Sequence, residues 1–593
     1  MTSRLDSPST LCEAFQSTAA AYPDHVALRT PDDSVHYTWR EYSEKVRALA
    51  AGLAGLGVRH GDTVGIMLTN RPEFHLVDTA AFHLGAVPFS IYNSLTAEQI
   101  TYVLGNAGNR VMICEEQFVP VLQQAIGETK VEHLVCIDAK PDGTLSLEDV
   151  EAAADESFDF EAAWKAVQPS DLLTLIYTSG TTGPPKGVEL THANLLAELA
   201  ATTTFLPTGP DDRIVSYLPD AHIANRWGSH YSSIYSGMQI TTLDDLKKAI
   251  AVLPSVRPTL FGAVPQVWYK VKAAIDKTLA EESSPVKKRL AFWAIEVGRK
   301  VARLQSEGKP VPKALELQHA LADKLVLSAV RKKLGLDQVR AAVTGAAAIS
   351  PEVLEFVLAL GIPCSEVWGM SETSCVVTMN RPGKIRIGTV GQAVPGVEIK
   401  TADDGELLVR GPLIMRGYRN DPVKTAEAVD PDGWLHTGDI ARIDEDGYVT
   451  LIDRKKELIV NAAGKNMSPT NIEGALRAAC PILGGAVVIG NDRPYIVALL
   501  ALDPDALPVF AEQNGISGTH EELAQHPVVL AAIETAVKEA NGKLSRVEQI
   551  KKYTVLPTIW EPSGDELTPT MKLKRKPIDA KYAVEIDALY ATT

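Results

Sequence analysis

Two kinds of hydrophobic spacing alternate along the first third of the chain. Residues 38–57, TWREYSEKVRALAAGLAGLG, place apolar side chains at helical spacing, and residues 63–68, TVGIML, form a short apolar run. The first pattern predicts an amphipathic helix and the second a buried strand. Further apolar runs follow at 111–116, 134–138 and 172–178. This alternation predicts parallel sheets covered by helices, which is an α/β fold.

Helical spacing returns in the middle of the chain, where turn signals divide it. Gly308, Pro310 and Pro312 would end any helix between the two amphipathic segments. We therefore predict a helical insertion at about 276–334. The apolar positions that carry the pattern are Leu290, Trp293, Val297, Val301, Leu304, Leu317, Leu321 and Leu325.

After Ala393 the sequence changes to short strands with turn signals. The pair Asp446-Gly447 within DEDGYVTLIDR predicts a hairpin turn. The charged run DRKKE at 453–457 then separates two apolar strands, which predicts a domain boundary. We expect a large N-terminal domain at 1–453, a hinge at 454–456 and a small α+β domain at 457–593.

Length and composition add the general class. A chain of 593 residues is too long for one hydrophobic core, and 45% apolar with 22% charged residues is typical of a soluble globular protein. Residues 1–16 lack the apolar core of a signal peptide, and no run of about 18 apolar residues occurs, so we expect a cytoplasmic protein. The six cysteines contain no C-x-x-C pair, which argues against a disulfide framework and a thiolate zinc site.

The charge is unevenly distributed. A formal net charge of -16 argues against general nucleic-acid binding, because a phosphate backbone would be repelled. Residues 285–334 nevertheless carry 12 Lys or Arg against 4 Asp or Glu. This basic region is either the solvated face of two helices or a peripheral contact with the anionic inner face of a membrane. Both interpretations stay open.

The candidate chemistry begins in the loop TSGTTGPPKG at 178–187. It is not the common mononucleotide loop, because Lys186 lies three residues after Gly183 and is followed by Gly187. Its glycines allow tight turns that present backbone N–H groups, and hydroxyls and a lysine add donors for phosphate. We predict that phosphate groups of a ligand contact Thr178, Ser179, Gly180, Thr181, Thr182, Gly183 and Lys186.

This loop resembles the phosphate loop of the adenylate-forming superfamily, which includes acyl-CoA synthetases, luciferases and peptide-synthetase adenylation domains. The resemblance covers roughly 23–576 and implies that family's fold, with large N-terminal and small mobile C-terminal domains. Six further motifs follow in order: SYLPDAHIANRW at 216–227, TGAAAIS at 344–350, VWGMSET at 367–373, GWLHTGD at 433–439, DRKKELIVNAAGKN at 453–466 and LTPTMKLKRK at 567–576.

The resemblance implies a nucleotide site. Trp368 stands where the family often has an aromatic residue that stacks on adenine, and Gly345, Ala346 and Gly369 would lie near the base. The carboxylate of Asp439 can accept both ribose hydroxyls. By the same resemblance, Arg454 would reach the ribose or the phosphates.

The reaction itself calls for cations. A carboxylate that attacks the α-phosphate of ATP brings two anions together, so we expect Mg²⁺, held by Glu372 and Thr178, and a lysine. Thr373 is a further candidate for α-phosphate contact. The resemblance assigns the bridging lysine to Lys572, with Lys574 as an alternative register.

The remaining expectations concern the acyl group and the thiol. His222 and Trp227 would lie on the substrate side, with a purely structural role for His222 left open. Lys456 would be the pivot about which the C-terminal domain swings after adenylation. That rotation would bring Gly464, Lys465 and Asn466 to the coenzyme A side of the site.

These expectations combine into an ATP-dependent acyl-CoA synthetase. Thr570 and Met571 stand before Lys572 where most members have Ser-Gly, which resembles the long-chain branch and favours medium to long fatty acids. Two alternatives remain: a fatty acyl-AMP ligase that delivers to a carrier protein, and a catalytically silent nucleotide- or lipid-binding protein. The oligomeric state is left open.

Overall fold

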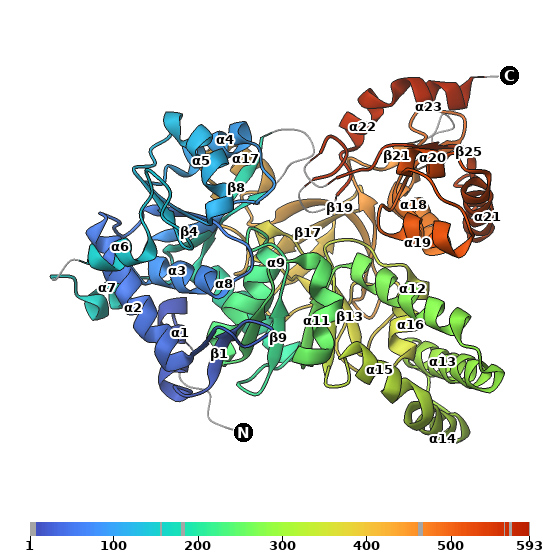
Figure 1. The fold of residues 1–593 in the computed structure, drawn as a ribbon, viewed down its shortest axis with the longest axis horizontal. Helices are drawn as coiled ribbons and strands as arrows, with labels where there is room; N and C mark the ends of the chain where they lie inside the picture. Colours follow the sequence, from blue (N-terminus) through green and yellow to red (C-terminus); the bar gives the residue numbers. More distant parts are fainter. Residues whose placement is uncertain are drawn as a thin grey trace.

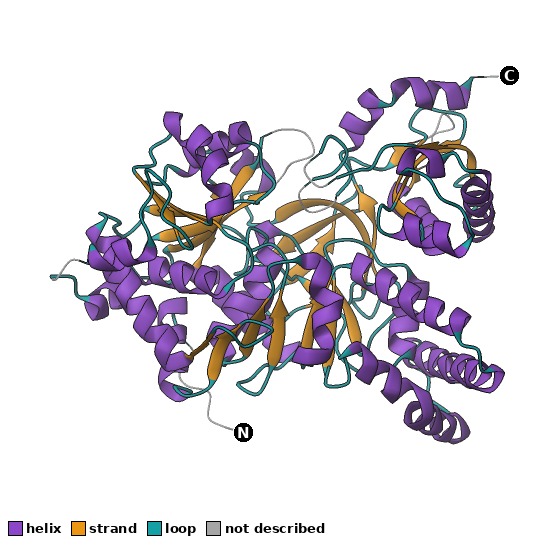
Figure 2. Ribbon diagram, in the orientation of Figure 1, coloured by secondary structure: helices purple, strands orange, loops and turns teal. Residues whose placement is uncertain are grey.

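The structure is a computed structural model that describes residues 8–154, 157–178, 184–460, 466–561, 564–568 and 572–591. A large N-terminal part occupies most of the molecule, and a smaller C-terminal part lies beside it (Figure 1). Strands lie inside both parts and helices outside them (Figure 2). Within the ranges given above, no helix is both long and apolar enough to cross a membrane.

The first sheet of the N-terminal part is parallel, as the alternating pattern predicts. Its order is β4-β3-β5-β6, and every residue of the central strand β3 is buried. Helix α2 begins after Thr38, which forms a capping box with Glu41. The elements are β3 (Thr63–Met67), β4 (Val87–Ser90), β5 (Val111–Cys114) and β6 (His133–Cys136), with α1 (Leu11–Ala21), α2 (Trp39–Gly55), α3 (Pro72–His83), α4 (Ala97–Ala107), α5 (Val119–Ala125), α6 (Leu147–Ala152) and α7 (Phe160–Ala166).

Two further sheets form the centre of the N-terminal part. One has the order β2-β1-β10-β9 and the other β11-β12-β13-β14-β15, with β9 beside β11. Strands β11, β12 and β13 are parallel, so their carboxyl ends meet at one edge. The strands are β1 (Val26–Arg29), β2 (His36–Thr38), β9 (Arg213–Ser216), β10 (Gln239–Thr242), β11 (Leu260–Ala263), β12 (Ala341–Thr344), β13 (Cys364–Trp368), β14 (Thr378–Met379) and β15 (Gln392–Ala393).

The apolar run at 172–178 forms a strand, β7 (Leu172–Thr178), but it does not extend the parallel sheet. It pairs antiparallel with β8 (Lys186–Thr191), which in turn pairs with β18 (Gly417–Tyr418). The connection from β7 to β8 is short, whereas a parallel pair needs a crossover of about a dozen residues or more. Our expectation of a parallel strand was therefore wrong at β7.

The predicted hairpin at Asp446-Gly447 is confirmed. It joins β19 and β20, and Gly447 adopts the positive φ of 80° that this turn requires. Asp439 of β19 and Arg454 of β20 are register partners, so the hairpin places their side chains together. The sheet has the order β16-β17-β19-β20, with β16 (Glu398–Thr401), β17 (Glu406–Arg410), β19 (Leu435–Ile443) and β20 (Val449–Arg454).

The predicted helical insertion is also present. Helix α13 ends before Gly308 and α14 begins after Pro312, as the turn signals indicate. The helix that leads into the insertion begins earlier than 276, because Pro265 occupies its first turn. The N-terminal part's other helices include α8 (His192–Phe205), α9 (Ile223–Asn225), α10 (Ser232–Ser236), α11 (Ala249–Val256), α12 (Pro265–Glu281), α13 (Pro285–Ser306), α14 (Lys313–Ala322), α15 (Ser328–Leu334), α16 (Pro351–Ala359) and α17 (Pro422–Ala428).

The C-terminal part has its own hydrophobic cores. No buried apolar residue of any core cluster in the described ranges lies between Val449 and Ile459, which brackets the charged run. The limits 453, 454–456 and 457 stay a proposal. Its elements are β21 (Ile459–Val460), β22 (Asn466–Met467), β23 (Leu483–Ile489), β24 (Ile496–Leu502) and β25 (Ile550–Leu556), with α18 (Pro469–Ala479), α19 (Ala506–Gln513), α20 (His520–Ala524), α21 (Pro527–Lys543), α22 (Arg575–Lys581) and α23 (Ala583–Tyr590).

Candidate active site

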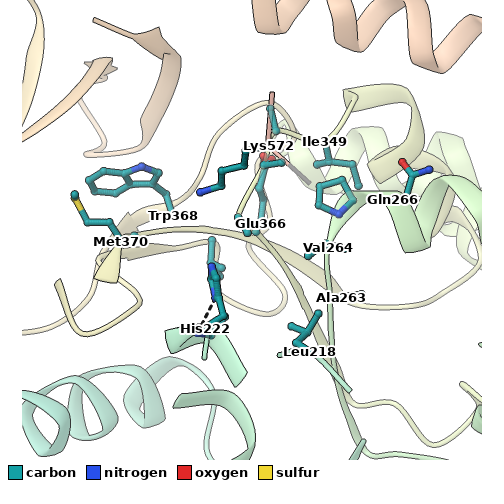
Figure 3. Close-up of a pocket in the computed structure, with 18 of the residues that line it drawn as sticks. Leu218, His222, Ala263, Val264, Gln266, Ile349, Glu366, Trp368, Met370 and Lys572 are labelled. Atoms are coloured by element: carbon teal, nitrogen blue, oxygen red, sulfur yellow. Dashed lines mark hydrogen bonds between the residues drawn. The ribbon is translucent and has the colours of Figure 1, made fainter. Parts of the chain in front are cut away.

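A cavity of about 2390 Å³ lies where the two parts of the chain meet. Its walls come from the ends of β7 and β13, from the segment around His222, and from the C-terminal residue Lys572. Figure 3 shows Lys572, Trp368, Glu366 and His222 pointing into this space. The cavity therefore brings together motifs that are up to about 390 residues apart in the sequence.

One wall of the cavity joins the residues predicted for adenine and ribose. The indole Nε1 of Trp368 donates to Oδ2 of Asp439 at 2.8 Å, and Arg454 Nε lies 3.6 Å from Oδ1. Burial raises the pKa of Asp439, while the guanidinium of Arg454 opposes that shift. The carboxylate is thus oriented by one hydrogen bond from a neutral indole and by one ion pair with a guanidinium.

Small residues next to this wall leave no room for a larger side chain. A Cβ at Gly369 would lie 1.6 Å from the carbonyl oxygen of Cys375, and one at Gly345 would lie 2.9 Å from Val367 Cγ2. Ala346 adopts a positive φ of 66°, which is uncommon for alanine. The backbone itself forms this edge of the site.

A second wall presents the predicted metal and phosphate residues. Glu372 lies in the 3-10 helix η6 (Ser371–Thr373) and is buried, and its Oε1 accepts from the hydroxyl of Tyr418 at 2.8 Å. Lys186 Nζ lies 4.2 Å from the centroid of the Tyr418 ring. The Tyr418 side chain therefore organises Glu372 through its hydroxyl and Lys186 through its ring.

Thr373 and Thr178 lie beside this wall. The buried hydroxyl of Thr373 donates to Met370 O and accepts from Met370 N, both at 3.0 Å, so it holds the turn that presents Glu372. Its contact with phosphate stays a prediction. Thr178 ends β7 at the cavity, opposite the start of β8 at Lys186.

The C-terminal part contributes Lys572 to the cavity. The pKa of Lys572 is lowered by burial between the two parts and by Arg454, and Asp439 and Glu372 oppose the shift. Its side chain still reaches solvent through the cavity. Lys574, the alternative register, instead donates to Gly564 O at 2.9 Å within the C-terminal part.

His222 faces Lys572 from the substrate-side motif. Its Nδ1 accepts from Ala224 N at 3.1 Å, so a neutral ring carries its proton on Nε2. Burial lowers the pKa of His222 to about 4, and the charge of Lys572 adds to that effect. The ring is therefore neutral at neutral pH. Trp227, also in this motif, is buried and lines the same cavity.

Several predicted residues lie outside the described residues. These are Ser179, Gly180, Thr181, Thr182 and Gly183 of the phosphate loop, and Gly464 and Lys465 of the coenzyme A side. Asn466 begins β22. Lys456 lies in the turn between β20 and β21, where Leu458 N donates to Arg454 O at 3.1 Å.

Among the residues that sequence reasoning missed, Tyr418 and Glu366 have polar groups that line the cavity. Tyr418 lies outside the quoted motifs, and only the pairing of β18 with β8 brings it beside Glu372. Glu366 precedes Trp368 by two residues on β13, so both point to the same face of the strand. Burial raises the pKa of Glu366 to about 8. That two-residue spacing was the available signal.

Comparison with known families decides the identity of this fold. The profile described as "AMP-binding enzyme" matches residues 15–419, and the profile described as "AMP-binding enzyme C-terminal domain" matches residues 456–593. This chain belongs to the AMP-binding enzyme family. Its α/β architecture, with a large N-terminal and a small C-terminal domain, is the adenylate-forming fold.

Several proteins with names of fatty-acid–CoA ligases resemble the chain over most of its length. The Mycobacterium tuberculosis protein fadD11 is 53% identical over 451 residues, which cover 76% of this chain and 79% of that protein. The long-chain-fatty-acid–CoA ligase FadD15 of Mycobacterium bovis is 36% identical over 96% of this chain and 95% of its own. The Xenopus laevis long-chain-fatty-acid–CoA ligase ACSBG2 is 33% identical over 98% of this chain and 84% of its own.

Two solved structures share the fold. The anthranilate CoA ligase AuaEII, in complex with anthranoyl-AMP, has a TM-score of 0.75 at 21% identity, covering 99% of this chain and 100% of that one. A Mycobacterium tuberculosis fatty acyl CoA synthetase has a TM-score of 0.62 at 21% identity, covering 97% and 99%. At this identity the likeness shows the architecture of the chain.

Proposed function

We propose that the protein is an ATP-dependent fatty acid–CoA ligase that acts on medium- to long-chain acids. A carboxylate oxygen of the acid attacks the α-phosphorus of ATP, the bond to pyrophosphate breaks, and acyl-AMP forms. The sulfur of coenzyme A then attacks the acyl carbon, AMP leaves, and the thiol proton is released. The relatives named long-chain-fatty-acid–CoA ligases, at 36% and 33% identity over nearly the whole chain, support this substrate class.

The observation that carries the proposal is the position of Lys572. It extends from the C-terminal domain into the cavity. There its positive charge interacts with the carboxylates of Asp439 and Glu372 and with the ring of His222. A lysine there offsets the repulsion between the attacking carboxylate and the α-phosphate. The Nε2–H of neutral His222 is available to orient a carboxylate oxygen beside it.

The nucleotide would be held by the N-terminal domain. Trp368 provides a face for adenine, Asp439 and Arg454 lie at the ribose position, and Lys186 meets the phosphates. Residues 179–183 complete the phosphate contacts in this proposal. Because the groups are fixed before the reaction, catalysis is mainly positional and electrostatic.

Magnesium fits the second wall of the cavity. Glu372 offers a buried carboxylate held in place by Tyr418, and Thr178 offers a hydroxyl, and Mg²⁺ prefers such oxygen ligands together with phosphate. When bound there, the ion would supply positive charge that offsets the negative charge of the phosphates.

The second half-reaction needs a different domain orientation. Lys572 and other C-terminal residues line the cavity, and in our proposal they stand in the path that the thiol would take to the acyl carbon. In our proposal this domain rotates about Lys456 after adenylation and presents Gly464, Lys465 and Asn466 to the site. One polypeptide then performs both steps in turn.

A single assay series tests the function. Purified protein is mixed with a fatty acid, ATP and coenzyme A, and AMP, pyrophosphate and acyl-CoA are measured. We expect acyl-CoA that requires all three substrates. Accumulation of acyl-AMP without thioester would favour a carrier-dependent ligase, and pyrophosphate release independent of added acid would contradict activation of a carboxylate. Acids from acetate to arachidate, with benzoate included, give the chain-length preference.

A peripheral contact with an anionic membrane is a finer part of this proposal. Large apolar side chains are exposed in the same helices that carry the basic region 285–334: Val286 at 76%, Phe292 at 55% and Leu317 at 74%. Exposed apolar groups beside lysines suit a negatively charged lipid surface. Arg331 is less suited, because its guanidinium is held by Asp323 and Leu360 O, both at 2.7 Å.

Vesicle binding tests this contact. Each lysine near an anionic surface contributes about 1 kcal/mol, so Lys332→Gln with Lys333→Gln should weaken binding to phosphatidylserine vesicles markedly at low salt. The matched control is Lys551→Gln with Lys552→Gln, which removes the same charge from the C-terminal domain. Equal binding by both double variants would contradict the assignment to region 285–334.

A further inference from the structure

The substrate-side motif contains one glycine with an unusual environment. Residues 226–231 form a π-helix turn. This conformation is rare in proteins, and where it occurs it often marks a functional site. From Asn225 to Tyr231 every residue is buried except Gly228, which keeps partial exposure. Because the flanking residues are covered, the exposed part of Gly228 faces a hollow within the protein.

That hollow is the cavity that also holds Lys572 and His222. Gly228 is among the residues that line it. A Cβ built on Gly228 has no heavy atom within 4 Å, in contrast to Gly369, where a Cβ would collide with backbone. Close packing therefore does not explain a glycine here, and glycine weakens a helix relative to alanine. What the glycine leaves is open volume.

The position of Gly228 matches the path of an acyl chain. It follows His222, which faces Lys572, by six residues, and at a helical rise of 1.5 Å per residue this is roughly 9 Å farther along the helix. The π-helix packs against α8 and β9. The same cavity is lined by Thr202 and Thr203 on α8 and by three apolar residues: Leu206 directly after α8, and Ile214 and Val215 on β9.

We propose that Gly228 is the specificity-determining position for acyl chain length. With the carboxylate at Lys572, the alkyl tail of a long, unbranched acid passes over the Cα of Gly228, where any side chain would narrow the channel. This inference rests on the proposed ligase function. It assigns the chain-length preference to one residue rather than to the size of the whole cavity.

The test compares Gly228→Leu with the wild-type protein on a series of straight-chain acids. One methylene in an apolar pocket alters kcat/KM by about 10–200-fold, so Gly228→Leu should lower kcat/KM for palmitate at least roughly tenfold relative to the shortest acid that the wild type activates. The KM for ATP should stay the same, since the nucleotide residues are untouched. Gly228→Ala should shift the preference in the same direction by less.

The matched control is Gly105→Leu. Gly105 is an exposed helical glycine on α4, also with no heavy atom within 4 Å of a built Cβ, and it does not line the cavity. It corrects for the gain in helix propensity. An unchanged palmitate-to-short-acid ratio in Gly228→Leu would overturn the inference, and if that variant does not fold, an unchanged ratio in Gly228→Ala would do so. A wild-type protein that activates no fatty acid would overturn the ligase function as well.

Discussion

Trp368 and Asp439 are joined by a hydrogen bond of 2.8 Å from the indole Nε1 to the carboxylate Oδ2, although 71 residues and two different sheets separate them. The bond links the predicted platform for adenine with the predicted acceptor for ribose. Tryptophan supplies a donor on the ring itself, which phenylalanine lacks. The nucleotide wall is thus organised before ATP binds.

Replacing Trp368 by Phe should raise the KM for ATP by about tenfold, because a hydrogen bond to a charged group contributes about 1.5–3 kcal/mol. The ring face for adenine is retained in this variant. Trp368→Ala should raise the KM further, since it removes both the donor and the stacking surface. Steady-state kinetics at saturating fatty acid and coenzyme A measure both values. Equal KM values for Trp368→Phe and the wild type would show that the bond does not organise ATP binding.

Tyr418→Phe should slow adenylation by about tenfold or more and raise the magnesium concentration needed for half-maximal rate. The variant removes the hydroxyl that donates to Glu372 Oε1 and leaves the ring beside Lys186 in place. Glu372→Gln should have a larger effect of the same kind. In the double variant, Tyr418→Phe should add little, because its target carboxylate is absent. Independent, fully additive effects would separate Tyr418 from the magnesium site.

Lys572→Ala should abolish carboxylate-dependent pyrophosphate release while largely sparing thioester formation from supplied acyl-adenylate. The charge of Lys572 matters where carboxylate meets α-phosphate, not where sulfur meets the acyl carbon. Lys574→Ala is the register control and should keep adenylation, because Lys574 contacts Gly564 O instead of the cavity. Comparable loss of both half-reactions in Lys572→Ala would argue against this role.

Lys456→Pro should give the reverse pattern, with pyrophosphate release retained and acyl transfer to coenzyme A lost. Proline fixes φ near -65° and restrains the preceding residue, so a backbone rotation at this turn is blocked. Lys456→Ala leaves the dihedral angles free and should change little. Single-turnover assays of each half-reaction decide the matter. If the proline variant transfers its acyl group at the wild-type rate, the rotation is centred elsewhere.

Glu366 should make the stability of the protein depend on pH. Burial raises its pKa from 4.5 to about 8 in the folded chain. The contribution of this carboxyl to the free energy of unfolding is therefore fully present below about pH 4.5. As the pH rises toward 8 the unfolded chain releases its proton first, and that contribution is lost. Glu366→Gln cannot ionise, so its melting temperature relative to the wild type should increase between pH 4.5 and 8 and then level off. The exposed Glu445→Gln is the control, and a difference independent of pH would contradict the prediction.

Local patterns in the sequence determined the elements and the family. The spacing at 38–57 predicted α2, the apolar run at 63–68 predicted β3, and Asp446-Gly447 predicted the β19–β20 turn. Such features depend on side-chain periodicity and on the backbone φ that a turn requires. Both are set by residues that are close together in the sequence. The ordered motifs then indicated an adenylate-forming enzyme, and the family comparison bears this out.

Only the tertiary structure decided which of these elements meet. Two contacts join segments that are distant in the sequence: Tyr418 with Glu372 and Trp368 with Asp439. The antiparallel direction of β7 and the open space beside Gly228 likewise depend on how the surrounding elements pack. No local periodicity encodes such pairs, because each depends on strand order and on the docking of whole elements against one another. The sequence determined the helices, the strands and the chemistry of their side chains. Packing between distant segments decided where these elements lie around the cavity, because side-chain spacing carries information over a few residues whereas the site spans several hundred.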